Sequence, residues 1–184
     1  MKILASIALV SAALVFPAAH AADAVMVGGQ SMLPSKTIVE NAVNSADHTT
    51  LVAAVKAAGL VETLQGKGPF TVFAPTNAAF NKLPAGTVDT LVKPESKATL
   101  TKILTYHVVP GKLDFDTLAA RIKKGGKNMT ELKTVSGGKL VVMMNGKHNL
   151  TVKDEKGGVA TISTYDVYQS NGVINVIDSV LMPN

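Results

Sequence analysis

The position of its turn signals constrains the fold of this chain of 184 residues more than any other feature. After Lys127, short runs of β-forming residues alternate with glycine-containing pairs, which are Gly137-Gly138, Asn145-Gly146, Gly157-Gly158 and Asn171-Gly172. Both residues of an Asn-Gly pair accept positive φ, so the pair favours a tight hairpin between antiparallel strands. Before Lys127, apolar residues recur at helical spacing instead. Helices in the first part and strands in the second predict an α+β fold.

The same patterns predict the individual elements. Helices are expected over 37–44, 47–58, 86–92, 94–106 and 114–124, and strands over 70–74, 131–135, 139–144, 149–153, 159–163, 166–168 and 173–177. Ser35 and Asp47 are plausible N-caps of the first two helices. Gly59 fits the position after a helix end, where a left-handed backbone is needed. Thr76 or Asn77 caps a short helix that turns Phe80 toward the core.

The N-terminus has the pattern of an export signal. Lys2 precedes an apolar run over 3–16, and Ala19-His20-Ala21 matches a small-x-small cleavage site. We therefore predict a signal peptide at 1–21, an extended N-terminal arm at 22–35 and one domain at 36–184. The alternative is a retained membrane anchor, for which the apolar run is short, since a span takes about 20 residues.

Cysteine is absent, so no disulfide, thiol nucleophile or cysteine-based metal site is available. The chain after residue 21 is still long enough to form one sizeable core without such links. The expected location is exported, either periplasmic or secreted to the extracellular space, with no transmembrane anchor after cleavage.

Three segments, in this order, resemble the motifs of the fasciclin domain family. They are GPFTVFAPTNAAF at 68–80, LTYHVVPG at 104–111 and NGVINVIDSVLMP at 171–183. The resemblance runs from about Lys36 to Pro183. It implies a compact β-sandwich or wedge of about seven strands with helices packed along one side. It also implies adhesion or surface binding, because the family is a module of secreted and cell-surface proteins.

The resemblance suggests partner-binding residues. Tyr106 and His107 match the Tyr-His motif that is implicated in adhesion by animal members. The alternative is that Tyr106 packs at a helix end and His107 makes an internal hydrogen bond that fixes the following turn. Asp166 and Val167 match an Asp-Ile pair of adhesive members, and Tyr168 follows. The alternative for this trio is an edge strand with a solvated Asp.

The densest basic stretch contains Arg121, Lys123, Lys124 and Lys127, in a chain of formal net charge +5. It is a candidate patch for an anionic ligand. The alternative is a solvated helix end whose cations complement the helix dipole. The excess of positive charge is too small to indicate nucleic acid, and export makes that partner less suitable still.

The sequence contains no recognisable catalytic pattern and no metal-ligand spacing among its histidines, so we predict no catalytic residue, metal or cofactor. The predicted function is an exported, non-enzymatic surface or matrix interaction module of the adhesion type. Its partner would be a protein or polysaccharide of the cell envelope or matrix. The alternative is a basic periplasmic protein that binds an acidic polysaccharide or another anionic ligand. The sequence does not indicate an oligomeric state.

Overall fold

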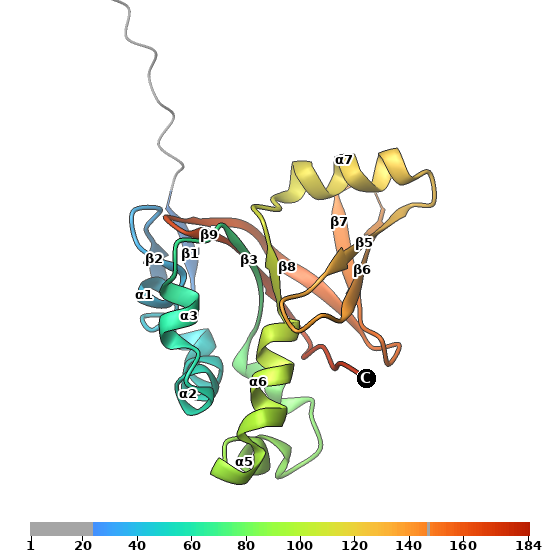
Figure 1. The fold of residues 1–184 in the computed structure, drawn as a ribbon. Helices are drawn as coiled ribbons and strands as arrows, with labels where there is room; N and C mark the ends of the chain where they lie inside the picture. Colours follow the sequence, from blue (N-terminus) through green and yellow to red (C-terminus); the bar gives the residue numbers. More distant parts are fainter. Residues whose placement is uncertain (1–23, 147) are drawn as a thin grey trace, which may run out of the picture.

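The fold is described from a computed structural model that covers residues 24–146 and 148–184 (Figure 1). Its main sheet has seven strands in the order β4-β3-β9-β8-β7-β6-β5, and a separate hairpin pairs β1 with β2. The strands are β1 (Val25–Val27), β2 (Gln30–Met32), β3 (Phe70–Pro75), β4 (Val108–Pro110), β5 (Met129–Lys133), β6 (Lys139–Asn145), β7 (Asn149–Lys153), β8 (Val159–Gln169) and β9 (Gly172–Ile177).

The helices fall into two groups around this sheet. The first group precedes β4 and consists of α1 (Ile38–Ala42), α2 (Thr49–Ala58), α3 (Val61–Gln65), α4 (Asn77–Asn81), α5 (Thr87–Leu91) and α6 (Lys97–Tyr106). Two 3-10 turns, η1 (Ala46–His48) and η2 (Pro94–Ser96), lead into α2 and α6. The second group is the single helix α7 (Phe115–Gly125), which lies apart from the others, against the β5–β7 end of the sheet (Figure 1). The predicted α+β fold with about seven strands is confirmed.

The central pair of strands, β3 and β9, divides the core into two clusters. These strands run parallel, with Thr71 opposite Val173, and every residue of β9 is buried. Val72 and Ala74 face a cluster that includes α1, α2 and α6, whereas Phe73 faces a cluster built with α7 and strands β5 to β8. Both faces of β3 and β9 are covered, so their sequences are mostly apolar and do not alternate between apolar and polar residues.

Helix ends agree with the local signals in most places. Gly59 adopts φ +74° after α2, as predicted. Thr76 caps α4 by accepting a hydrogen bond from the Ala79 backbone N–H. The first helix differs, because its N-cap is Thr37 and not Ser35. Thr37 forms a reciprocal capping box with Glu40, and this satisfies two backbone donors at once. Asp47 lies inside η1 and caps no helix.

The segment before α1 corrects the prediction of an extended arm over 22–35. From Val25 the chain forms the β1–β2 hairpin, and Val27 and Met32 are buried against the first cluster. Asn41 of α1 holds the segment that follows, because its side chain both donates to the Leu33 carbonyl and accepts from the Leu33 N–H. Burial of these two apolar side chains stabilises the packing of the hairpin against the domain.

The predicted strands 159–163 and 166–168 form one strand, β8, with irregular register between Ile162 and Val167. Asp166 lies within this irregularity at φ +55°, which explains why the pattern looked interrupted. The predicted signal peptide at 1–21 lies outside the described residues. Among the residues that the structure does describe, no helix is long and apolar enough to cross a membrane.

Candidate functional site

Tyr106 is a buried structural residue at the end of α6. Its ring is fully buried, and its hydroxyl donates to the Lys139 carbonyl at 2.6 Å and accepts from the Glu155 N–H at 3.0 Å. Burial raises the pKa of Tyr106 to about 12. The side chain therefore joins α6 to β6 and to the turn after β7, and it presents no surface to a partner.

His107 is equally enclosed. Its Nδ1 lies 2.8 Å from the Ile103 carbonyl, and its Nε2 accepts from the Leu181 N–H at 3.0 Å. These contacts require the tautomer in which Nδ1 carries the proton and Nε2 is the acceptor. Burial lowers the pKa of His107 to about 4, so the ring is neutral at physiological pH. The prediction that Tyr106 and His107 contact a partner does not fit this fold, because both side chains are buried. Their structural alternative agrees with these contacts.

The three sequence motifs meet at this point. The Phe73 N–H of the first motif donates to the His107 carbonyl of the second at 2.9 Å. Leu181 of the third motif donates to the ring of the same histidine. The first and third motifs are also paired directly as the parallel strands β3 and β9. The residues of the three motifs therefore contact one another at the centre of the fold and stabilise it.

The predicted trio Asp166, Val167 and Tyr168 lies beside the N-terminus of α7. Asp166 Oδ1 accepts from the Phe115 N–H at 2.7 Å, so this carboxylate satisfies a free donor of the helix. Burial raises the pKa of Asp166, and the neighbouring carboxylates of Asp114 and Asp116 add to the effect. Val167 was predicted to contact a partner, but its side chain is 1% exposed in this fold and packs in the core instead.

Tyr168 is half-buried and belongs to the same cluster. Its hydroxyl donates to Asp114 Oδ2 at 3.4 Å, and the Lys112 Nζ lies 4.4 Å from its ring centroid. Burial raises the pKa of Tyr168 to about 12, and the negative charges of Asp166 and Asp114 act in the same direction. Asp166 and Tyr168 are partly exposed, but both side chains also make hydrogen bonds within the fold.

The predicted basic patch is exposed at the C-terminal end of α7. Arg121, Lys123 and Lys124 lie in its last turns and Lys127 follows it. None of the four forms an ion pair with another residue in 24–146 or 148–184. We call these four residues the α7 basic end.

A second surface was not predicted from the sequence. Strands β5 to β8 pair in register, so Glu131, Val141, Lys153 and Val159 share the face that points away from α7. Met129 and Val159 are 40% and 50% exposed on it, and Val141 and Met143 are half-buried. Lysines flank these apolar residues at 133, 139 and 153. We call this surface the outer β face. The sequence signal that could have revealed it is in β6, where the apolar run over 140–144 places apolar side chains on both faces of the strand.

Within residues 24–146 and 148–184, no three His, Asp or Glu side chains gather in a way that could hold an ion.

The three motifs therefore converge at the centre of one domain of mixed α+β architecture. A family model described as the Fasciclin domain matches residues 46–183, and the chain belongs to this family. Protein sll1483 of Synechocystis sp. is 52% identical over 149 residues, covering 80% of this chain and 73% of that protein. The cell surface glycolipoprotein MPB83 of Mycobacterium bovis is 40% identical over 124 residues, covering 67% of this chain and 48% of that protein.

The fold also matches a solved structure, the FAS1 domain pair from the insect cell adhesion molecule Fasciclin I. The TM-score is 0.71 at 18% identity, and the match covers 82% of this chain and 52% of that one. This chain therefore spans about half of the domain pair.

Proposed function

We propose that this chain is an adhesion-type interaction module that docks non-covalently on a partner at the cell envelope or in the matrix. The observation that carries the proposal is the outer β face, with solvent-exposed apolar side chains among lysines. Membership of the fasciclin family supports it, since MPB83 is named as a cell surface protein and Fasciclin I as a cell adhesion molecule.

The outer β face departs from what a solvated sheet requires. A one-sided antiparallel sheet normally alternates apolar residues toward the core with polar residues toward water. Here Met129 and Val159 are turned to water although polar residues would serve there. Met129 pairs with Met143, whereas Lys153 lies between Val141 and Val159 on this face. Exposed apolar side chains bordered by charges are typical of interaction sites.

The charges on this face indicate the chemistry of the partner. Glu131 forms an exposed ion pair with Lys139, with Nζ and Oε2 3.3 Å apart. Lys133 and Lys153 form no ion pair with any residue in the described part of the chain. A partner that offers apolar groups ringed by carboxylates would complement the face. We therefore infer an acidic protein surface as the occupant, with steering by charge and affinity from apolar contact.

A second candidate function is binding of an acidic polysaccharide at the α7 basic end. Its support is the exposure of Arg121, Lys123, Lys124 and Lys127 without ion pairs to other described residues. Such binding would be driven by charge, so it would weaken steeply as salt screens the cations.

One titration separates the two candidates. The domain is titrated against envelope preparations of the exporting cell and against heparin as an acidic polysaccharide, at low and high salt. We expect Val159→Glu with Met129→Glu to abolish envelope binding at both salt concentrations, while Lys123→Glu with Lys124→Glu has little effect. If only the lysine variants lose binding and high salt abolishes it for the wild type, the outer β face is the wrong site.

The proposed location is outside the cytoplasm. It depends on the expected signal at 1–21, with cleavage after Ala21. Sequencing of the exported protein from its N-terminus should begin at Ala22, and a product that keeps residues 3–16 would contradict this location.

A further inference from the structure

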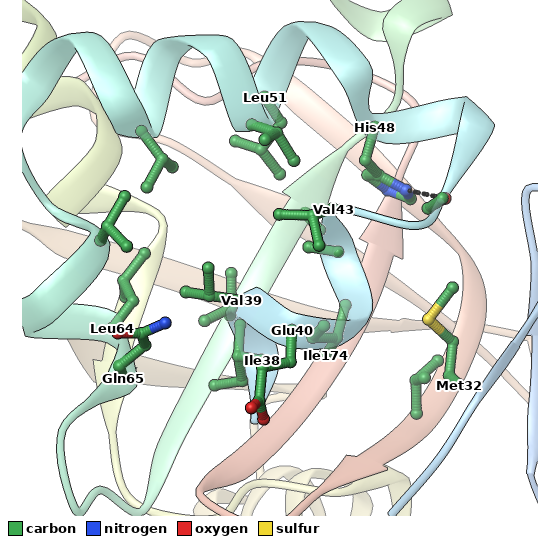
Figure 2. Close-up of a pocket in the computed structure, with 18 of the residues that line it drawn as sticks. Met32, Ile38, Val39, Glu40, Val43, His48, Leu51, Leu64, Gln65 and Ile174 are labelled. Carbon is green, nitrogen blue, oxygen red and sulfur yellow. Dashed lines mark hydrogen bonds between the residues drawn. The ribbon is translucent and has the colours of Figure 1, made fainter. Parts of the chain in front are cut away.

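A cavity of about 280 Å³ lies in the first half of the molecule, away from the outer β face (Figure 2). The β1–β2 hairpin and helices α1, α2 and α3 surround it, and residues of β3 and β9 form its floor. In Figure 2 the labelled residues run from Leu64 and Gln65 at one end to His48 and Met32 at the other. The cavity is open to solvent on one side, so a small molecule has a way in.

The walls of the cavity are apolar. The deep lining includes Met32, Ile38, Leu51, Val55, Leu64 and Ile174, all buried. The charged and amide side chains that border it, Glu40, Lys56 and Gln65, are exposed and so belong to its opening. Water is held poorly by such walls. An apolar cavity of about 150 Å³ is known to stay dry and to admit benzene. This one is nearly twice that size.

The opening of the cavity also exposes apolar surface. Val43, the residue after α1, is 46% exposed, and Val39 and Val52 are half-buried where α1 faces α2 across the cavity. Helix α1 packs on α3 and β9, while α2 packs on α6 and α4. The two helices therefore leave between them a space that their own side chains do not fill.

One polar atom inside this region lacks a partner. His48 is 3% exposed and lines the cavity. Its Nδ1 lies 2.9 Å from Ser45 Oγ (Figure 2). Its Nε2 has no hydrogen-bond partner among the described residues. The Ala74 carbonyl is near enough to act on the pKa of the ring, but it lies outside hydrogen-bond geometry. Buried polar atoms are rarely left unpaired, because each costs about 1–3 kcal/mol.

The protonation of His48 restricts what can pair with it. Burial lowers the pKa of His48, so the ring is neutral at physiological pH. A neutral imidazole donates from one nitrogen and accepts at the other. A hydroxyl group can both donate and accept, so it matches Nε2 in either tautomer. A carboxylate fits poorly, because burying an ionised group among apolar walls is expensive without a cation beside it.

We propose that the cavity binds a small neutral amphiphile, with an apolar body between α1 and α2 and a single hydroxyl group hydrogen-bonded to His48 Nε2. The ligand class is that of apolar alcohols. Their apolar body would contact the apolar walls of the cavity, and their hydroxyl group would form a hydrogen bond with His48 Nε2. This site is separate from the outer β face, so binding here requires no protein partner.

The test uses the described domain with 2-naphthol and 2-methylnaphthalene, which have nearly the same shape but differ in the hydroxyl. The chain has no tryptophan, so naphthyl fluorescence can be read without interference. We expect saturable binding of both probes. In His48→Phe, which keeps a ring but removes the nitrogen, 2-naphthol should lose roughly threefold to tenfold in affinity relative to 2-methylnaphthalene. Val55→Phe, which fills the cavity from α2, should abolish binding of both. The anion 2-naphthoate should bind more weakly than 2-naphthol.

A measurement on the wild type protects the test against a variant that fails to fold. The imidazole ¹⁵N resonance of His48 Nε2 should shift much further on addition of 2-naphthol, which forms the hydrogen bond, than on addition of 2-methylnaphthalene. The proposal is overturned if neither probe binds saturably, if the Nε2 resonance ignores 2-naphthol, or if a folded His48→Phe keeps the wild-type affinity ratio.

Discussion

At the scale of single residues, His107 shows how a motif residue can serve the fold alone. Its Nε2 accepts a hydrogen bond from the Leu181 N–H, and its Nδ1 donates one to the Ile103 carbonyl. His107→Ala removes both contacts and leaves buried backbone groups unpaired. We expect a loss of on the order of 1–3 kcal/mol in the free energy of unfolding, measured by urea denaturation. His148→Ala, at an exposed histidine, is the control and should change little. Loss of partner binding at unchanged stability would instead make His107 a contact residue.

Tyr106 allows a finer test, because its hydroxyl can be removed without touching its ring. In Tyr106→Phe the fully buried ring is kept. The Lys139 carbonyl and the Glu155 N–H, however, lose their partner. We expect a loss of about 1–3 kcal/mol in the free energy of unfolding, without an accompanying change in partner binding. Equal urea midpoints for the two proteins would show that the hydroxyl contributes nothing to stability.

At the scale of elements, the N-terminus of α7 is held by two carboxylates. Asp114 accepts from the Thr117 N–H and Asp166 from the Phe115 N–H. Asp166→Asn keeps a side-chain oxygen for Phe115, tolerates the positive φ of this position and removes repulsion from Asp114 and Asp116. We expect Asp166→Asn to be as stable as the wild type or slightly more stable at neutral pH.

The matching truncation should behave differently. Asp166→Ala has no oxygen to offer the helix end and, unlike Asn, is strained at the positive φ of this position, so it should lower the free energy of unfolding by about 1–3 kcal/mol. Thermal melts of both variants, followed by circular dichroism at 222 nm, give the comparison. Equal destabilisation by Asn and Ala would mean that the charge of Asp166, and not its hydrogen bond, holds α7.

The sequence predicted best those elements whose ends depend only on residues close to them in the chain. Gly59 and Thr76 follow from short-range rules of capping and positive φ. The sequence pattern predicts two strands where the structure has the single strand β8, because Asp166, at positive φ, interrupts the strand and bonds to the start of α7. The parallel pairing of β3 with β9 joins residues about 100 positions apart, and no local pattern specifies it.

The candidate sites follow the same division. The exposure of Lys123 and Lys124 could be anticipated from an amphipathic helix that ends in cations. The burial of Val167 could not, because it depends on packing against the first cluster. The cavity beside His48 is lined by residues of α1, α2, α3 and α6, of the β1–β2 hairpin and of the sheet, so it exists only once these elements are assembled.

At the scale of the whole molecule, each of the two clusters contains or borders a buried histidine, and this predicts a response to acid. His48 lines the cavity of the first cluster and His107 contacts Leu181 of the second. Burial lowers the pKa of both, to about 4 for His107. Between pH 6.5 and 4 the unfolded chain therefore binds more protons than the folded one. Above pH 6.5 both histidines are neutral in the folded and in the unfolded chain, so they cause no loss of stability. As the pH falls through this window, the free energy of unfolding decreases by at most about 1.4 kcal/mol per pH unit for each histidine.

Urea midpoints at pH 7.5, 6.5, 5.5 and 4.5 measure this response, and we expect them to fall steadily below pH 6.5. The carboxyl groups of Asp114, Asp178 and Glu155, whose pKa values are lowered in the fold, add their own loss only near and below their ordinary values. His107→Gln, which cannot take up a proton, should be less stable at pH 7.5 but should show a shallower fall between pH 6.5 and 4.5. A wild-type midpoint that stays level across this range, or a His107→Gln profile parallel to it, would mean that burial of His107 does not control the acid stability of the molecule.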